Sequence, residues 1–450
     1  MNRLVTLIIS VGLLTALVSV DVYGDSGSDY WPTWRGPHAT GVAPKGNPPL
    51  TWSETKNIKW KVKLSGQGTS SPVIWGDKIF FLTAIETDKK GSPNAQAASK
   101  SQNAEERPPF HGGRAPKNIY KFDLVCLDRK TGKLRWQKTA REELPHEGHH
   151  SNYGGFASYS PVTDGKYVWA SFGSRGVHCY DIDGNHKWSR DFGKMTIKMM
   201  FGEGSSPALA GDAVIVVIDH EDDSFIYALN KGTGETIWEK GRDEKSSWAT
   251  PLPVDVNGKM EVVTSATNFV RSYDVKTGDL IWQCSGQTGN VIPSPVVGFG
   301  KVFCTSGFRG SALQAIELGR TGDLSGSDAI TWQVNEATPY VPSPLLYGDK
   351  IYVCSVNRAI ISCYQAQTGK VNFVKHRLEG MGEIFASPVG AAERVYFVGQ
   401  NGRTQVIKLS EKLQVLATNT LVDKFDCSPA IVGDELFLKG KEHLYCITDL

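Results

Sequence analysis

Two segments decide the fold of this 450-residue chain: SSPVIWGDKIFFLT at residues 70–83 and CLDRKTGKLRW at residues 126–136. In the first, Pro72 begins an apolar run that a Gly-Asp turn at residues 76–77 divides into two short strands. In the second, a strand ends at Asp128, and a Thr-Gly turn leads into another strand that carries Trp136. Together the two segments predict a unit of four short β-strands.

This unit recurs along the chain. A second element follows each Pro segment, and in most units it carries a tight turn and a Trp, as in ALNKGTGETIW and SYDVKTGDLIW. Eight such units predict an all-β fold, namely an eight-bladed β-propeller. After a first interval of 89 residues, the prolines that begin the units recur every 41 to 49 residues: Pro72, Pro161, Pro207, Pro251, Pro295, Pro344, Pro388 and Pro429.

The eighth unit ends at Leu450, before its fourth strand. The segment NIKWKVKL at residues 57–64 supplies the matching pattern, with Trp60 in the aromatic position. We therefore predict that the N-terminal strand completes the last blade, which closes the ring and removes its exposed strand edges.

The aromatic position of the fourth strand is expected to cover the seam to the next blade. Because Lys133 of the Thr-Gly-Lys turn is replaced by Glu235 or Asp279 in other units, the turn is structural and is not a phosphate loop. In the two remaining units Phe373 and Leu416 are assigned to the aromatic position. The docking tryptophans are Trp60, Trp136, Trp188, Trp238, Trp282 and Trp332.

The N-terminus has the composition of an export signal. Residues 1–24 combine Arg3 with a long apolar run, which predicts a signal peptide cleaved after Gly24. An uncleaved membrane anchor is the alternative, because the run is only slightly shorter than the roughly 20 residues of a spanning helix. We expect an exported monomer, periplasmic or extracellular, with an extension at 25–56, a propeller at 57–450 and an insertion at 85–117. The net charge of +2 gives no electrostatic footprint for nucleic acid.

These repeats resemble the tryptophan-docking repeats of the pyrroloquinoline-quinone (PQQ) propellers. The segment WPTWRGPHATGVAP at residues 31–44 and the segment at 57–83 are similar to secreted bacterial PQQ-binding-like propeller proteins. The resemblance covers about residues 30–450. It implies the propeller fold, and it implies either a quinoprotein dehydrogenase or a scaffold similar in architecture to the barrel-assembly lipoprotein of the outer membrane. The chain lacks the adjacent Cys pair of the alcohol-oxidising quinoproteins and the lipobox Cys of the lipoprotein.

Alternating strand direction places the connections between blades on one face and the Thr-Gly turns on the other. We expect function on the first face, because loops on a rigid scaffold carry most binding residues. Four residues on the approaches to the central channel are candidates for ligand binding: Glu203, Trp248, Tyr340 and Asp426. Trp248 is either a stacking platform for a planar ligand or a plug of the channel, and we favour the plug.

Three further sets of polar residues raise the question of a metal or a disulfide. The tip DHEDDSF holds the cation candidates Asp219, His220, Glu221, Asp222 and Asp223, with a plain charged hairpin tip as the alternative. LPHEGHH at residues 144–150 is interpreted as a solvated polar loop. Cys126, Cys179, Cys363 and Cys446 share one small-residue position in four units and are expected to be packing residues, so only Cys354 and Cys363 are a candidate disulfide.

Three functions follow from these patterns. The preferred hypothesis is a non-catalytic propeller that binds or scaffolds a protein or small molecule in the cell envelope, without a cofactor. The first alternative is a PQQ-dependent dehydrogenase with Ca²⁺, in which Asp426 or Glu203 would be the base. The second is a carbohydrate- or peptide-binding propeller with Trp248 and Tyr340 as anchors.

Overall fold

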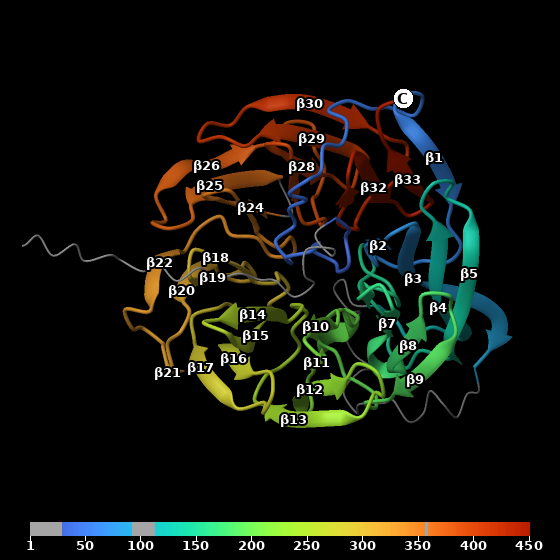
Figure 1. Ribbon diagram of the computed structural model, residues 1–450, viewed down its shortest axis with the longest axis horizontal. Coiled ribbons are helices and arrows are strands. Elements are labelled where there is room, and N and C mark those ends of the chain that lie inside the picture. The colour runs from blue at the N-terminus through green and yellow to red at the C-terminus, as the bar shows by residue number, and fades with distance from the viewer. Residues whose placement is uncertain (1–28, 92–112, 356–358) are drawn as a thin grey trace, which may run out of the picture.

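The computed structural model describes residues 29–91, 113–355 and 359–450, and these residues form eight sheets around a central axis, in which all strand pairs but one are antiparallel (Figure 1). The predicted eight-bladed all-β propeller is confirmed. The predicted signal peptide at 1–24 and the middle of the predicted insertion, 92–112, lie outside the described residues. No helix in the described part of the chain is long and apolar enough to cross a membrane.

The first four blades follow one another along the chain. Their strands are β2 (Val73–Trp75), β3 (Lys78–Lys90), β4 (Asn118–Asp128) and β5 (Leu134–Glu143); β6 (Val162–Thr163), β7 (Tyr167–Ser171), β8 (Val177–Asp181) and β9 (His186–Arg190); β10 (Ala208–Ala210), β11 (Ala213–Ile218), β12 (Ser224–Asn230) and β13 (Thr236–Arg242); and β14 (Leu252–Val256), β15 (Lys259–Ser265), β16 (Val270–Asp274) and β17 (Leu280–Cys284), to which β21 (Gly322–Asp323) adds a fifth strand. Two short 3₁₀ turns, η1 (Gly173–Arg175) and η2 (Lys198–Met200), lie in blade 2 and after it.

The last four blades complete the ring. Their strands are β18 (Val296–Gly298), β19 (Lys301–Ser306), β20 (Ala312–Glu317) and β22 (Ile330–Val334); β23 (Leu345–Tyr347), β24 (Lys350–Ser355), β25 (Ile360–Gln365) and β26 (Val371–Arg377); β27 (Val389–Ala391), β28 (Arg394–Val398), β29 (Arg403–Lys408) and β30 (Val415–Thr420); and β31 (Ala430–Val432), β32 (Glu435–Lys439), β33 (His443–Ile447) and β1 (Ile58–Lys63). The pairing of β1 with β33 confirms that the N-terminal strand completes the last blade.

The outer strand of each blade carries the docking residue. The indole N–H of Trp238 donates to the carbonyl of Val275 in the next blade at 2.8 Å. The Thr-Gly turn lies under the same ring, since a Cβ added to Gly278 would meet the indole at 2.6 Å. Four other tryptophans donate in the same way to the following blade: Trp60, Trp136, Trp188 and Trp332.

The assignment of Leu416 to the docking position was wrong. In blade 7, Ala417 pairs with Val406, and Leu416 is the extra residue at a shift in register. The other blades show the same irregularity one residue before the aromatic side chain, as at Ile237 before Trp238. A β-bulge therefore sets which residue of the outer strand faces the seam.

A ring of hydroxyl groups joins the inner ends of the blades. The residue before each repeat proline is Ser or Thr, and its backbone N–H donates to the hydroxyl of the equivalent residue in the next blade. The ring closes, because Ser428 N donates to Ser71 Oγ at 2.9 Å. The eight bonds are 2.8 to 3.3 Å long and link Ser71, Ser160, Ser206, Thr250, Ser294, Ser343, Ser387 and Ser428.

The N-terminal extension crosses the channel. Trp31 exchanges backbone hydrogen bonds with Ile74 of the innermost strand of blade 1, and Ala43 N donates to Gly390 O in blade 7. Arg35, only 3% exposed, donates to the carbonyl oxygens of Pro344 and Pro388, both at 2.9 Å. Burial lowers the pKa of the Arg35 guanidinium to about 9. The extension thus binds to the inner strands of blades on both sides of the channel.

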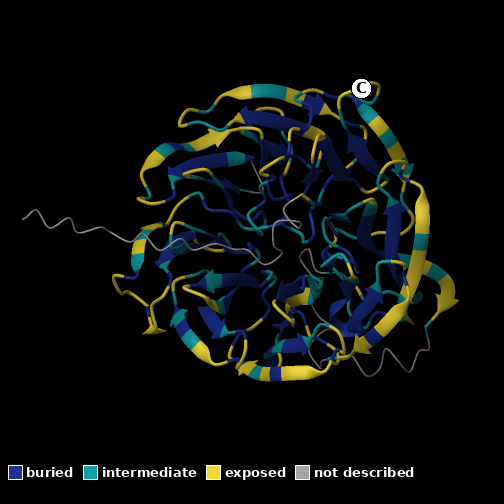
Figure 2. Cartoon of the chain, viewed as in Figure 1, coloured by how far each residue is buried: buried dark blue, intermediate teal, exposed yellow. Residues whose placement is uncertain are grey.

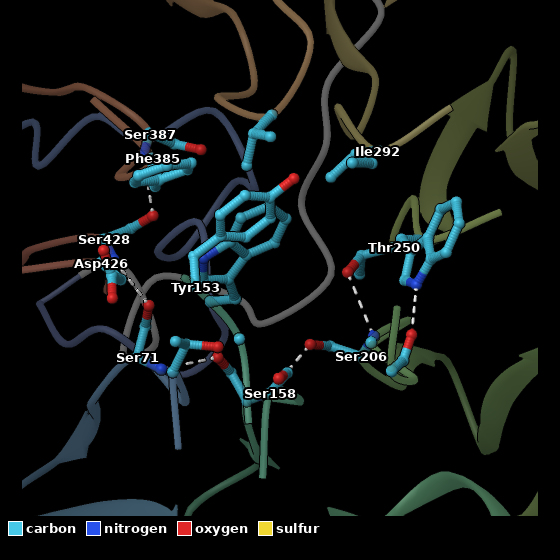
Figure 3. A pocket seen from close by; sticks show the side chains of 18 of the residues that line it. Ser71, Tyr153, Ser158, Ser206, Thr250, Ile292, Phe385, Ser387, Asp426 and Ser428 are labelled. Atoms are coloured by element: carbon cyan, nitrogen blue, oxygen red, sulfur yellow. Dashed lines mark hydrogen bonds between the residues drawn. The ribbon is translucent and has the colours of Figure 1, made fainter. Parts of the chain in front are cut away.

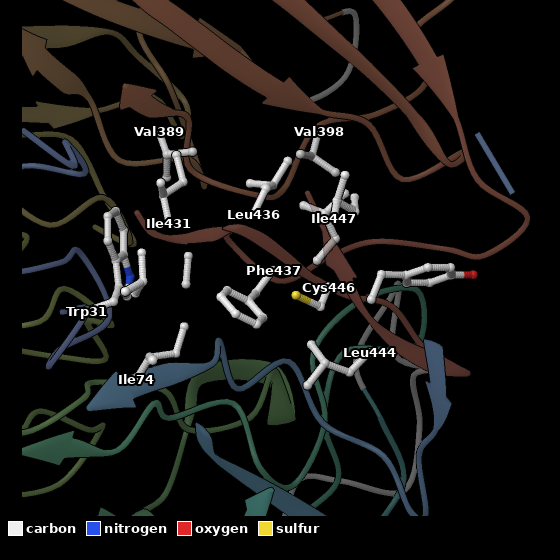
Figure 4. Packing of buried hydrophobic residues seen from close by; sticks show 14 of the residues in the cluster. Trp31, Ile74, Val389, Val398, Ile431, Leu436, Phe437, Leu444, Cys446 and Ile447 are labelled. Carbon is white, nitrogen blue, oxygen red and sulfur yellow. The ribbon is translucent and has the colours of Figure 1, made fainter. Parts of the chain in front are cut away.

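The core lies within the blades and at their seams. Buried residues fill the inner strands, whereas the outer strands at the rim are mostly exposed or half-buried (Figure 2). At the closing seam, Trp31 packs into one cluster with Ile74, Ile431 and Phe437, so the extension is part of the core there (Figure 4).

Candidate ligand-binding funnel

The four ligand-binding candidates of the sequence come together at one cavity. Glu203, Trp248, Tyr340 and Asp426 all line a space of about 160 Å³ at the centre of the ring, among residues of the connections between blades. We call this cavity the funnel (Figure 3). Trp34 of the extension lines both the funnel and a small cavity near Arg35, so it lies between the two.

Trp248 belongs to the wall of the funnel and does not plug it. Its indole N–H donates to Gly202 O at 2.6 Å, and its backbone N–H donates to Val291 O at 2.9 Å. These bonds tie the residue to the connections on both sides. The favoured interpretation of Trp248 as a plug is therefore replaced by a ring fixed at the edge of the cavity.

Tyr153 occupies the middle of the funnel, between the residues of blades 7 and 8 and those of blades 3 to 5 (Figure 3). Its ring stacks on His150 at 3.8 Å and lies 4.4 Å from Phe385, which comes from the connection between blades 6 and 7. Burial raises the pKa of the Tyr153 phenol above its ordinary value. Sequence reasoning missed Tyr153, Phe385 and Trp34.

Tyr340 lies in the wall with a ring behind it. It stacks on Phe308 at 5.2 Å with an angle of 28° between the rings. Burial raises the pKa of Tyr340, so the phenol is neutral at physiological pH. The residue presents an uncharged aromatic surface to the cavity.

The carboxylate of Glu203 is hydrogen-bonded and ion-paired within the protein. Its two carboxylate oxygens accept hydrogen bonds from the backbone N–H and the hydroxyl of Ser174, at 2.8 and 2.5 Å, and from Arg175 at 3.1 Å. Arg175 also binds Glu143 at 3.1 Å. Because its charge and lone pairs are already satisfied, Glu203 orders the wall of the funnel and is a poor candidate for a general base.

Asp426 differs from Glu203. Its side chain is only 3% exposed, and Oδ1 accepts a hydrogen bond from Gln400 Nε2 at 2.7 Å. Oδ2 accepts no hydrogen bond from the described residues, and its nearest cation is the half-exposed Lys441, at 3.5 Å. A buried carboxylate oxygen without a donor is costly, so a ligand with an N–H, an O–H or a positive charge would stabilise it.

A second cavity of about 280 Å³ lies beside the funnel and shares Thr69, Tyr153, Gly154 and Asp426 with it. Lys439 and Lys441 line this second cavity and do not line the funnel. Lys439 is buried, and its ammonium donates to Gly68 O at 2.7 Å. The positive charges of this region therefore face the second cavity.

The cation candidates at 219–223 form a hydrogen-bonded structural turn. Asp219 is buried and makes a bidentate ion pair with Arg242, at 2.7 and 3.1 Å, and it also accepts a hydrogen bond from Ser247. Glu221 accepts hydrogen bonds from Ser246, and His220 lies within hydrogen-bond distance of Asp223 O, while Asp222 is exposed. No group of three or more His, Cys, Asp or Glu side chains in the described residues is placed to hold a metal ion.

The loop at 144–150 is folded onto the protein and is not solvated as expected. His146 Nε2 is 2.8 Å from Met195 O, and Glu147 accepts a hydrogen bond from Ile197 N at 2.9 Å. Burial raises the pKa of the Glu147 carboxyl to about 7.

All eight cysteines are free and buried. Cys363 pairs with Tyr352 across the ladder and Cys354 with Ile361, so the candidate disulfide does not form. Cys126 and Cys446 face the docking residues Trp136 and Trp60, as expected of packing positions. Burial raises the pKa of the Cys126 thiol to about 12, which leaves it protonated and unreactive.

Residues 42–215, 120–375 and 222–449 each match the sequence model of the family described as outer membrane protein assembly factor BamB. The chain belongs to this BamB family. No curated protein matches its sequence.

Among solved structures, the BamB-family chain is similar to BamB from Moraxella catarrhalis, with 13% identity, a TM-score of 0.51, and coverage of 82% of this chain and 99% of that one. It is also similar to the computationally designed Ika8 protein, with 13% identity, a TM-score of 0.51, and coverage of 76% and 97%. A europium-containing methanol dehydrogenase has 12% identity and a TM-score of 0.44 over 94% and 92% of the two chains. At these identities the two likenesses with a TM-score of 0.51 support the propeller fold alone.

Proposed function

We propose that this BamB-family chain is a non-catalytic binding propeller of the cell envelope, and that it takes its ligand in the funnel. The observation that carries the proposal is the chemistry of the funnel wall. The wall combines aromatic rings, hydroxyls and two carboxylates, and one of these carboxylates, Glu203, is already bound by Ser174 and Arg175. Acid–base catalysis requires a titratable group within reach of the substrate and, in most mechanisms, a second one as its partner. Of the two carboxylates, only Asp426 meets the first requirement.

The same wall does not fit PQQ. The cofactor is a tricarboxylate, and burying its negative charges requires cations or several donors. Of the described residues that line the funnel, none is Lys, Arg, His, Asn or Gln, so its hydroxyl groups would face the cofactor without a cation, and its two carboxylates carry the same sign of charge as the cofactor. PQQ would meet Asp426 and Glu203 at close range, so like-charge repulsion opposes its binding.

The family supports a role in binding other molecules, since its description names an assembly factor of outer membrane proteins. The predicted signal peptide at residues 1–24 supports export to the envelope, where such a partner would be met. In this proposal the face that carries the blade connections is the recognition surface, and the face with the Thr-Gly turns is structural.

The dehydrogenase alternative is tested by absorbance titration of the full chain with PQQ and Ca²⁺, followed by a dye-linked assay with alcohols and sugars. We expect no saturable change in the PQQ spectrum and no turnover. Saturable PQQ binding with turnover would overturn the proposed function. Cross-linking in envelope fractions tests the binding role, and we expect a reproducible partner that crosslinks through the face of the blade connections.

A further inference from the structure

We infer that the funnel binds a small organic cation with an alkylated ammonium group. The inference rests on the proposed function, because it names the ligand class of the same funnel. Aromatic cages with carboxylates at their edge are the general chemical solution for such cations.

The funnel is an aromatic cage built from the connections between blades. Each ring comes from a different segment, so the cage is a product of the closed ring and not of any one blade. The face of an aromatic ring carries a negative quadrupole, which attracts a cation within about 6 Å of the ring centre. Six rings line the cavity: Trp34, Tyr153, Phe201, Trp248, Tyr340 and Phe385.

The charges around the cage favour a positive ligand. Asp426 Oδ2 is buried and without a hydrogen-bond donor among the described residues, and it borders the cavity. The cations of the region do not line the funnel itself: Lys439 and Lys441 line the second cavity, although Lys441 Nζ lies 3.5 Å from Asp426 Oδ2, and the Arg35 guanidinium donates to backbone carbonyls. An ammonium group in the funnel would add a second positive charge beside Asp426, whose only cation within 4 Å among the described residues is the half-exposed Lys441.

Hydrogen-bonding capacity separates a cation from a saccharide. A saccharide needs both donors and acceptors from its site, because each hydroxyl does both. The hydroxyls of the wall can donate, but the Trp248 indole N–H is already bound to Gly202 O, and the side chains of the described lining residues include no amide or cationic donor. An alkylated ammonium needs no donor, only ring faces and a negative charge, so it fits the wall better.

The size of the cavity is suitable. Its volume of about 160 Å³ is several times the roughly 30 Å³ that a water molecule takes in the liquid. The cavity therefore has room for a trimethylammonium group. Gly154, next to Tyr153 in the lining, has a φ of +90°, a backbone conformation that residues other than glycine rarely adopt.

The test compares two ligands of equal shape. Choline carries a trimethylammonium group, and 3,3-dimethyl-1-butanol replaces its nitrogen with carbon and is neutral. Calorimetric titration of the full chain should show saturable choline binding and at least about tenfold weaker binding of the neutral analogue. Asp426→Asn should weaken choline binding by about tenfold or more and leave the neutral analogue unchanged. Asp212→Asn, which changes a carboxylate that is 92% exposed, is the matched control and should bind choline as the native chain does.

Three results would overturn the inference: equal affinity for choline and the neutral analogue, no saturable choline binding, or saturable binding of glucose or maltose that Asp426→Asn does not change. Near-UV circular dichroism and the melting temperature of each variant show whether the fold is retained. If Asp426→Asn is unfolded, Trp248→Phe, which keeps a ring in the wall, replaces it and should weaken choline binding severalfold. Failure of choline binding leaves the proposed function standing when the PQQ titration is also negative. PQQ-dependent turnover removes the proposed function whatever choline does.

Discussion

Each blade seam is held at two ends, and the two ends differ in how uniform they are. At the rim, an indole from one blade docks on the next, but blade 6 uses Phe373 and blade 7 uses Ala417 at this position. At the channel, the hydroxyl of a Ser or Thr accepts a backbone N–H in all eight blades. The rim therefore tolerates variation that the channel does not show.

The difference has a physical reason. A Trp at the rim stabilises its seam mainly by burying apolar area, which a smaller residue retains in part. A hydroxyl of the ring accepts a buried backbone N–H, and no smaller apolar residue does this even in part. The closing seam uses both devices, since Trp60 donates to Arg129 O and Ser428 N donates to Ser71 Oγ.

The largest effect should come from the rim. Trp238→Ala removes a nearly buried indole from the seam between blades 3 and 4, and it should lower the free energy of unfolding by about 4 kcal/mol. Trp238→Phe keeps a ring but loses the bond to Val275 O and part of the buried apolar area, so it should cost about 1 to 2 kcal/mol. Denaturant unfolding followed by fluorescence measures both. Equal losses for the two variants would show that the bond, and not the ring, holds the rim.

A slightly smaller effect should come from the connection face. Asp219→Asn leaves Arg242 buried without its counter-ion and should cost about 3 kcal/mol. The turn at 219–223 is held by this ion pair, so EDTA should leave the melting temperature of the native chain unchanged. If Ca²⁺ raises the melting temperature of the native chain by several degrees but not that of Asp219→Asn, the hypothesis of a cation site at 219–223 is supported.

In the hydroxyl ring at the channel, a single substitution should cost less stability, and the cost should be the same at different seams. Ser294→Ala leaves the backbone N–H of Thr250 without its acceptor and should cost about 1 to 3 kcal/mol. Ser71→Ala at the closing seam should cost the same amount, whereas Thr250→Ser keeps the hydroxyl and should be close to neutral. A much larger loss for Ser71→Ala in denaturant unfolding would mean that closure depends on this one seam.

Most of the fold was predictable because the repeat is visible in the sequence. The prolines that begin each unit and Trp60 in the segment at 57–64 gave the blade number and the closing strand. Leu416 was misassigned because a bulge shifts the outer strand by one residue, and a bulge leaves no mark in the hydrophobic pattern. The hydroxyl ring could have been predicted, since Ser or Thr precedes every repeat proline.

The funnel was only half predictable. Glu203, Trp248, Tyr340 and Asp426 were placed at the channel because they lie at the same point of their units, just before an inner strand. Tyr153 lies in a long connection and Trp34 in the extension. Both are outside the repeat, so the repeat does not predict whether their side chains reach the channel. The cation hypothesis for 219–223 also came from residues that are close in sequence. The partner of Asp219 is Arg242, which lies at the end of another strand of the blade, and the local sequence does not show this pairing.

The smallest effect is a pH dependence at the connection face. Burial raises the pKa of Glu147 to about 7 in the folded chain, above its ordinary value of 4.5. The folded state therefore favours the protonated carboxyl, so stability should be highest below about pH 4.5, fall as the pH rises toward 7, and stay level above it. Because the group is partly exposed, the whole change should be about 1 kcal/mol. Glu147→Gln keeps the acceptor for Ile197 N and should remove this part of the pH dependence of the free energy of unfolding. An unchanged pH profile in the Gln variant would place the titrating group elsewhere, whereas the Glu142→Gln control, at an exposed carboxyl on β5, should leave the fall between pH 4.5 and 7 in place.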